Sequence, residues 1–334
     1  MASSSERKIY FSFFMFTTDL RPNDREYTKL IVSHIQALRK LGYAGFDLPI
    51  APKDTLDHQS EVESYAKFRQ TLDDAGLDDV RFTTNVAATR TFDPSSMYAE
   101  QRAIGLSYLK SRVDITKALR GDIMAGPLVC PYNVFPTTDF NQPIWSDALQ
   151  DWLLLRYHNA QPVFEELGEH AARQGVKVAI EPVDHWETPG PNLVSDVLRF
   201  LDEVASPQVG VCIDSAHVVQ GSDGPAAFTS DVKRATAARR LHYVHISPPN
   251  RGAVADSWIP WKRFLGPILE SYDGPFLVEV FNAIPVFQNI LRLNRRKFLI
   301  PDEDILDAGR PNAYDIAREA IATLRREIGA DSES

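Results

Sequence analysis

The sequence has few cysteines and no long apolar stretch. Its only two cysteines, Cys130 and Cys212, both lie in apolar runs, so no disulfide framework is expected and a reducing, cytoplasmic location is predicted. No stretch approaches the roughly 18 consecutive apolar residues that span a bilayer, so we expect no membrane segment. The apolar run at residues 9–16 is short and lacks a small-residue cleavage pattern after it, so we interpret it as a strand rather than a signal peptide.

Phosphate-binding and nucleic-acid-binding features are also scarce. The turn TTDLRPNDR after the first apolar run contains no glycine-rich phosphate pattern, which disfavours a dinucleotide-binding open sheet. The net charge is −9, and a protein surface that binds nucleic acid is usually basic. We therefore expect a small-molecule ligand rather than a nucleic acid.

Strand-like and helix-like stretches alternate along the 334 residues. Near-continuous apolar strands that alternate with helices indicate a parallel sheet, and eight such repeats predict a single (β/α)8 barrel domain over residues 1–334. A doubly wound open sheet is the competing arrangement. The strands are predicted at residues 9–16, 44–48, 80–86, 123–129, 176–181, 209–214, 241–246 and 276–280, and the helices at 25–41, 61–75, 97–119, 146–174, 193–204, 225–238, 258–272 and 313–328.

Residues 282–312 form a stretch that is long for one loop of such a barrel. We predict that this stretch is an insertion after the eighth strand with a helix of its own. It is a candidate lid or subunit contact.

Four polar residues stand at the ends of the last four predicted strands: Glu181 in VKVAIEP, Asp214 in VGVCIDSAH, His245 in LHYVHIS and Glu279 in PFLVEVF. Burying an unpaired charge costs several kcal/mol or more, so these positions need a compensating partner. The carboxyl ends of barrel strands meet at the active-site mouth, where the four side chains can share one ion. Three carboxylates and one imidazole suit Mn²⁺, Mg²⁺ or Co²⁺. The alternative is that each acid caps the helix after its strand.

Three more polar residues follow these strand ends. Glu187 lies six residues after the first acid, His217 lies three residues after the aspartate, and Arg251 lies six residues after the histidine. Imidazole and guanidinium groups at a barrel mouth can hold hydroxyl or carbonyl oxygens of a sugar. Alternatively, His217 is bonded locally at a helix start and Arg251 is a solvated loop charge.

These spacings resemble those of the xylose isomerase-like barrel superfamily, and within it the D-tagatose and D-psicose 3-epimerases. In that family a metal-ligating Glu precedes a substrate-contacting Glu by six residues, as Glu181 precedes Glu187 in IEPVDHWE. A ligating Asp precedes a substrate-contacting His by three residues, as Asp214 precedes His217 in CIDSAH.

The remaining motifs extend the resemblance. A ligating His stands six residues before a substrate-contacting Arg-Gly pair, as His245 and Arg251 do in HISPPNRG, and a last ligating Glu ends strand eight, as Glu279 does in LVEVF. The resemblance implies a divalent metal, with Mn²⁺ favoured over Mg²⁺ or Co²⁺. It also implies proton transfer next to a sugar carbonyl, with Glu181 and Glu279 as the two proton carriers. It implies a homo-oligomer as well.

Some segments differ from the ketose epimerase pattern. Pro248 and Pro249 stand where those epimerases often carry an acid, the following loop reads AVADSWIPW, and residues 285–312 are longer than a typical ketose epimerase needs. The large subunits of C-glycoside deglycosidases resemble the same barrel and ligands. They act on 3-keto-glycosides with a small β-rich partner subunit, and the proton abstraction there drives loss of the aglycone. That function is the alternative to epimerisation.

Aromatic residues near the mouth are relevant to this choice. Tyr132, Trp186, Trp258 and Trp261 can stack on an aglycone or a sugar ring, although helix packing is the expected role of Trp258 and Trp261.

Two other functions stay open at this point. A DNA-repair endonuclease of the related barrel family would need more than eight histidines and a basic face. A non-catalytic barrel could bind a sugar without turning it over.

Overall fold

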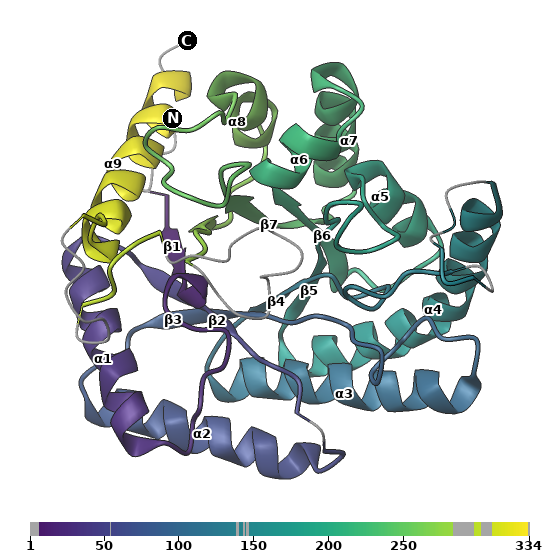
Figure 1. The fold of residues 1–334 in the computed structure, drawn as a ribbon, viewed down its shortest axis with the longest axis horizontal. Helices are drawn as coiled ribbons and strands as arrows, with labels where there is room; N and C mark the ends of the chain where they lie inside the picture. Colours follow the sequence, from purple (N-terminus) through teal and green to yellow (C-terminus); the bar gives the residue numbers. More distant parts are fainter. Residues whose placement is uncertain are drawn as a thin grey trace.

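Eight parallel strands close into a barrel in chain order, with β1 paired to β8 (Figure 1). The computed structural model of the chain describes residues 7–53, 55–137, 140–142, 144, 147–282, 297–301 and 309–332. The predicted (β/α)8 barrel is confirmed, and the open sheet is wrong. The strands are β1 (Ile9–Ser12), β2 (Gly45–Pro49), β3 (Arg81–Asn85), β4 (Ile123–Gly126), β5 (Lys177–Ile180), β6 (Val209–Asp214), β7 (Leu241–Ile246) and β8 (Phe276–Val278).

Helices surround the strands and cover the outer face of the barrel (Figure 1). A large apolar core lies between the two layers, and Phe46, Phe82, Phe164 and Phe264 are among its largest fully buried side chains. Within the described ranges, every helix is too short or too polar to cross a membrane. The helices are α1 (Arg25–Lys40), α2 (His58–Asp74), α3 (Ala99–Ala118), α4 (Asp147–Gln174), α5 (Val194–Asp202), α6 (Ser215–Gly221), α7 (Pro225–Ala237), α8 (Trp261–Leu269) and α9 (Ala313–Ser332).

Local signals at the helix ends explain why the boundaries fall where they do. Asp24 caps α1 by accepting a hydrogen bond from the backbone N–H of Tyr27 at 3.0 Å. Gly42, Gly76 and Gly175 follow α1, α2 and α4 with positive φ angles of 100°, 74° and 69°, a conformation that glycine adopts at little cost. The predicted glycine stops of these helices are therefore confirmed.

Several predicted boundaries are wrong. The first strand ends at Ser12 instead of residue 16, because the Ser12 side chain accepts from the backbone N–H of Phe14 and starts a 3₁₀ turn at Phe13–Met15. The helix predicted at 258–272 is limited to α8, since Pro260 stands at its N-cap position. The short helix α6, directly after β6, was not predicted at all.

The predicted insertion at residues 282–312 lies mostly outside the described residues. Of this stretch, residues 282, 297–301 and 309–312 are described, and Leu299 forms an isolated parallel bridge with Asn312. The insertion and its role as a lid or subunit contact stay predictions, as do the single domain over residues 1–334 and the homo-oligomer.

Alternate residues of a barrel strand point inward, and this period of two sets the position of the site. The barrel interior contains an apolar layer, and the next inward-facing position on each of β5 to β8 is polar. The apolar layer consists of Tyr10, Ile123, Ala125, Ala179, Cys212, Tyr243 and Leu277. The polar residues each stand two positions after one of the last four: Glu181 after Ala179, Asp214 after Cys212, His245 after Tyr243 and Glu279 after Leu277.

Candidate active site

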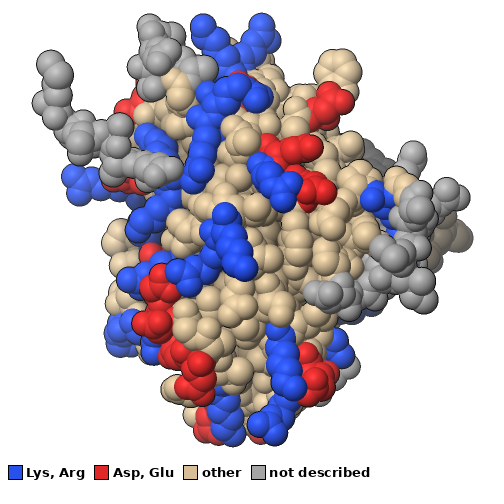
Figure 2. Space-filling view, turned by 90° about the vertical axis from the view of Figure 1, so that its left-hand side faces the viewer, with Lys and Arg blue, Asp and Glu red and all other residues tan. Residues whose placement is uncertain are grey.

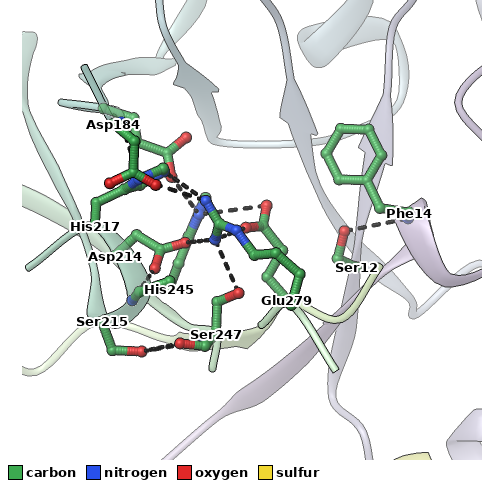
Figure 3. A network of polar contacts seen from close by, with 12 residues as sticks. Ser12, Phe14, Asp184, Asp214, Ser215, His217, His245, Ser247 and Glu279 are labelled. Atoms are coloured by element: carbon green, nitrogen blue, oxygen red, sulfur yellow. Dashed lines mark hydrogen bonds and ion pairs between the residues drawn. The ribbon is translucent and has the colours of Figure 1, made fainter. Parts of the chain in front are cut away.

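The four predicted strand-end residues converge at the carboxyl end of the barrel, and Figure 3 shows three of them, Asp214, His245 and Glu279. Asp214 and His245 are paired neighbours on β6 and β7. Glu181 directly follows β5 and is fixed by its backbone N–H, which donates to the carbonyl oxygen of Gly126 at 2.9 Å. Glu279 directly follows β8, and its backbone N–H donates to the carbonyl oxygen of Ile246 at 2.9 Å. Each side chain is therefore held by the sheet and not by a free loop.

The four side chains form one buried group. One ligand atom from each of Glu181, Asp214, His245 and Glu279 lies within 4.8 Å of the other three, and all four residues are buried. The Nδ1 atom of His245 lies 3.3 Å from Oε1 of Glu181 and 3.6 Å from Oε1 of Glu279. The interpretation that these acids only cap separate helices does not account for this convergence, although Asp214 does cap α6 as well.

The donor set fits a divalent cation. Neither ring nitrogen of His245 has a hydrogen-bond partner among the described residues, although the side chain is fully buried. A buried imidazole nitrogen without a partner is costly, and a metal ion would remove this cost. Three carboxylates around one imidazole form the oxygen-rich environment that Mn²⁺, Mg²⁺ or Co²⁺ accept. Glu181, Asp214, His245 and Glu279 are the residues that would hold the ion.

The electrostatics of Glu279 and Asp214 differ. Burial raises the pKa of Glu279 well above its usual range; the carboxylates of Glu181 and Asp214 add to this effect, while His245 opposes it. Burial also acts to raise the pKa of Asp214, but the Arg251 guanidinium, together with the two nearby histidines, lowers it to about 2. The lowered pKa favours the anionic form of Asp214, whereas Glu279 gains a proton more readily.

Arg251 connects the parts of the site. Its Nη1 atom lies 2.8 Å from Oδ2 of Asp214 and 3.4 Å from Oε2 of Glu279, and it donates to Oγ of Ser247 at 2.9 Å. Its backbone has a φ of 55°, which is strained for a residue with a side chain. The carbonyl oxygen of Arg251 accepts from the backbone N–H of Phe281 at 3.0 Å, so packing at the barrel mouth maintains this conformation. The alternative interpretation of Arg251 as a solvated loop charge is wrong, because the residue is buried.

His217 and Glu187 lie beside the first group. His217 is buried at the start of α6, and its Nε2 atom lies 3.7 Å from Oε1 of Glu181 and 3.8 Å from Oε2 of Glu187. Tyr132 donates from its hydroxyl to Oε1 of Glu187 at 3.1 Å. Burial raises the pKa of Glu187, which His217 and Arg251 oppose. All seven residues predicted for the site are therefore brought together in space.

A cavity of about 370 Å³ is lined by five of these seven residues: Glu181, Glu187, His217, Arg251 and Glu279. Such a volume lies in the range of roughly 300–1,000 Å³ that is typical of ligand pockets. Most of its charged lining comes from residues that follow β5 to β8, with Asp19 and Lys53 in addition, and the segments after β1 to β4 contribute much of the apolar lining. The apolar lining residues are Phe14, Pro49, Ile50, Ala51, Pro52, Ala87, Pro127, Val183 and Phe281.

The predicted aromatic contacts are only partly present. Among the described residues that line the cavity, Tyr132 is present, while Trp186, Trp258 and Trp261 are not. Trp258 is 90% exposed, so the expectation that it packs against a helix is wrong. Trp261 begins α8 and is partly buried against the core, as expected.

Sequence reasoning assigned no role to Asp184, which the structure places in the site. This residue lies in the loop after β5 and is buried, and its Oδ2 atom lies 3.1 Å from Nδ1 of His217 (Figure 3). The segment EPVDHWE contains this additional acid between Glu181 and Glu187. Its position between two predicted site residues was the signal in the sequence that could have indicated a role in the site. The sequence does not show that Asp184 lies close to His217, because the two residues are 33 positions apart.

Curated proteins with similar sequences are sugar epimerases. L-ribulose 3-epimerase of Methylomonas sp. (strain DH-1) is 25% identical over 182 residues, which cover 54% of this chain and 57% of that protein. Ketose 3-epimerase of Arthrobacter globiformis is 29% identical over 139 residues, or 40% of this chain and 45% of that protein. The chain thus matches about half the length of these two relatives. D-psicose 3-epimerase of Agrobacterium fabrum is 22% identical over 275 residues, or 82% of this chain and 84% of that protein.

Solved structures give a concordant result. A candidate sugar phosphate isomerase/epimerase from Anabaena variabilis is 56% identical and superposes with a TM-score of 0.95 over 97% of this chain and 99% of that one. D-allulose 3-epimerase from Methylomonas sp., solved in complex with D-allulose, shares the fold at 21% identity with a TM-score of 0.72 over 96% of this chain and 98% of that one. The model of the xylose isomerase-like TIM barrel family matches residues 35–310, most of the chain, and the protein belongs to that family.

Proposed function

We propose that this protein is a divalent-metal-dependent sugar epimerase or isomerase that moves a proton at the carbon next to a sugar carbonyl, with 3-epimerisation of a ketose as the reaction. The observation that carries the proposal is the buried group of three carboxylates and one imidazole at the ends of β5 to β8. The relatives named as ketose, L-ribulose and D-psicose 3-epimerases support the same reaction. Mn²⁺ is the cation that we propose for this oxygen-rich set.

Glu181 and Glu279 are the proposed proton carriers. A divalent ion held by the four residues would polarise the substrate carbonyl and make the neighbouring C–H bond more acidic. Glu181 and Glu279 follow β5 and β8, which flank the strands of the other two ligands, so the two acids can address opposite faces of one carbon. One takes the proton and the other returns one on the opposite face. The raised pKa of Glu279 favours uptake of a proton by this carboxylate.

The residues beside this group are the proposed substrate contacts. Arg251 and His217 present nitrogen atoms to the cavity, and Glu187 accepts from Tyr132 at its edge. Guanidinium, imidazole and carboxylate groups in a water-poor pocket bind sugar oxygens directionally. They would orient the carbon that loses its proton between the two acids.

Hydrogen exchange at the substrate carbon tests this function. The protein is incubated with Mn²⁺ in D₂O together with D-fructose, D-psicose or D-tagatose, and deuterium at carbon 3 is measured by NMR. We expect deuterium to enter at carbon 3 and the C3 epimer to accumulate. Glu279→Gln keeps the shape of the side chain but cannot take up the proton, so the rate is expected to fall by roughly 10²–10⁴-fold.

Glu270→Gln is the matched control, since Glu270 is an exposed acid at the end of α8. This variant is expected to keep the full exchange rate. A protein that binds one of these sugars tightly but exchanges no hydrogen would contradict the proposal and support a non-catalytic sugar-binding barrel.

The cavity supports a second candidate, the elimination of an aglycone from a 3-keto-glycoside. Its apolar lining residues, which include Phe14, Ile50 and Phe281, offer hydrophobic surface that the hydroxyl groups of a free sugar do not match. In this reaction Glu181 or Glu279 takes the proton at C2 beside the ketone. The electron pair then forms the C1–C2 double bond as the bond from C1 to the aglycone breaks, and the aglycone leaves and takes up a proton.

Release of the aglycone tests the second candidate. A 3-keto-C-glycoside and a 3-keto-O-glycoside are incubated with the Mn²⁺-loaded protein, alone and with a co-expressed small subunit, and the free aglycone is measured by chromatography. Exchange at carbon 3 of a ketose without release of any aglycone would favour the epimerase. The reverse pattern would favour the lyase.

A further inference from the structure

A carboxylate and two hydroxyl groups form a chain through the apolar layer beneath the site, and the proposed reaction does not use them. Asp47 on β2, Thr83 on β3 and Tyr243 on β7 are all fully buried. Oδ1 of Asp47 accepts from the Thr83 hydroxyl at 2.6 Å, and Oγ1 of Thr83 lies 2.9 Å from the Tyr243 hydroxyl. In the closed sheet β7 stands opposite β3, so this chain links the two sides of the barrel.

The carboxylate sets the direction of both hydrogen bonds. An ionised carboxylate can only accept, so the single hydroxyl proton of Thr83 points to Asp47. The Thr83 oxygen is then left as an acceptor, and the Tyr243 hydroxyl donates to it. Hydrogen bonds aligned in this way strengthen one another in a low-dielectric interior. The hydroxyl end of the Tyr243 side chain is therefore held in one position.

The ring of Tyr243 contacts the ring of His245, one of the four proposed ligands. The two ring centroids lie 4.8 Å apart and the ring planes are at 84°, which is an edge-to-face contact. A histidine that binds a metal is usually oriented by a hydrogen bond from its second nitrogen. Among the described residues neither ring nitrogen of His245 has such a partner, and the nearby thiol of Cys212 is only a weak donor. Packing against the Tyr243 ring is therefore the contact that orients this imidazole.

A purely structural role does not explain polar groups at this depth. Oδ2 of Asp47 is buried and has no hydrogen-bond partner among the described residues. Such a carboxylate lowers stability in comparison with an apolar side chain, and apolar side chains fill most of this layer. The cost of burying Asp47 is explained if its hydrogen bond to Thr83 serves the site above.

We propose that Asp47, Thr83 and Tyr243 are positioning residues of the metal centre, in which the hydrogen-bonded chain fixes Tyr243 and Tyr243 holds the His245 imidazole in the orientation that binds the cation. The proposal rests on the proposed metal-dependent function of the same site. An imidazole that is free to turn binds a cation less tightly, because binding must then order it. Outer residues that orient metal ligands typically change metal affinity by roughly 10–100-fold.

The dissociation constant of Mn²⁺ measures this contribution without any turnover. It is determined for the full chain by the EPR signal of the free ion, at pH 8. This pH lies above the pKa of about 6 to which burial raises Asp47, so the carboxylate is ionised. Thr83→Val and Tyr243→Phe each break the chain and keep this charge, and each is expected to raise the Kd by roughly 10–100-fold. The double variant is expected to raise it no further, because both changes remove the same link.

Thr84→Val is the matched control. Thr84 follows Thr83 on β3 and is equally buried, and its hydroxyl lies 2.6 Å from that of Thr116 on the outer helix α3. This variant breaks a similar pair of buried hydroxyls that faces away from the site. We expect it to lose about as much stability as Thr83→Val in urea denaturation and to keep the wild-type Kd for Mn²⁺. If Thr83→Val does not fold, Tyr243→Phe still decides the question, because it keeps the aromatic ring.

An unchanged Kd in Tyr243→Phe and Thr83→Val would overturn the proposal. If Asp47→Asn alone raised the Kd, the charge of Asp47 would attract the cation directly and the chain would orient nothing. A loss of affinity in Thr84→Val as large as that in Thr83→Val would also contradict the proposal, since general destabilisation would then explain both. A wild type that binds Mn²⁺ but exchanges no hydrogen on the sugars would contradict only the proposed reaction.

Discussion

At the scale of the residue, similar side chains of this chain acquire opposite properties from their surroundings. His242 and His245 lie three residues apart on β7, and both are buried. Burial opposes a raised pKa of His245, but Cys212, Glu181 and Glu279 together raise it. Burial and Lys177 lower the pKa of His242 to about 4. The sequence LHYVHIS shows the alternation that turns one histidine inward. The neighbours that set each pKa come from other strands and are not visible in the sequence.

His242 leads to a prediction about pH. Its folded pKa of about 4 lies below the usual value of 6.5, so protonation favours the unfolded chain. The stability that depends on neutral His242 is complete above pH 6.5 and is lost as the pH falls towards 4, by roughly 3 kcal/mol in total. His242→Asn is expected to make the free energy of unfolding less dependent on pH between 6.5 and 4, measured by urea denaturation. The exposed His185→Asn is the control. Equal pH dependence in the His242 variant and the wild type would contradict the prediction.

At the scale of the element, strand and helix identity was readable from the sequence, while several boundaries were not. The eight apolar runs and the glycines that end α1, α2 and α4 predicted the alternation correctly. The run FSFFMF continues the apolar pattern of β1, yet residues 13–15 form a 3₁₀ turn. An apolar run does not reveal where its backbone stops pairing with neighbouring strands. Figure 2 shows that Lys and Arg side chains occur beside Asp and Glu side chains on the face of the molecule that carries α1 and α9.

The buried pair of Arg112 and Glu61 joins α3 to α2 and leads to a prediction at this scale. Arg112 is fully buried and donates to Oε2 of Glu61, while its Nη1 atom has no partner among the described residues. Arg112→Leu leaves a buried carboxylate and is expected to lower the free energy of unfolding by about 3–5 kcal/mol. The double variant Glu61→Leu with Arg112→Leu is expected to recover much of this loss, because no buried charge remains. Urea denaturation of both variants measures the coupling, and equal losses would contradict the explanation.

At the scale of the whole molecule, the candidate site connects the second half of the barrel. Its four proposed ligands come from four adjacent strands, and β8 pairs with β1 to close the sheet. The order of these residues and the barrel together predicted their convergence, because strand ends meet at one rim. The sequence did not show the size of the cavity or the position of its apolar side, since these depend on loops after β1 to β4 that contain no motif.

Metal binding is expected to stabilise the entire fold. The unfolded chain cannot hold Glu181, Asp214, His245 and Glu279 together, so an ion that binds them favours the folded state. At a free Mn²⁺ concentration of about 100 times Kd, the free energy of unfolding is expected to rise by roughly 2.7 kcal/mol. EDTA is expected to reverse this gain, as measured by urea denaturation. Glu279→Gln removes one ligand and is expected to reduce the gain, whereas Glu270→Gln keeps it. If Mn²⁺ changed the stability of both variants and of the wild type equally, the ion would be binding elsewhere, because only one of the three proteins lacks a proposed ligand.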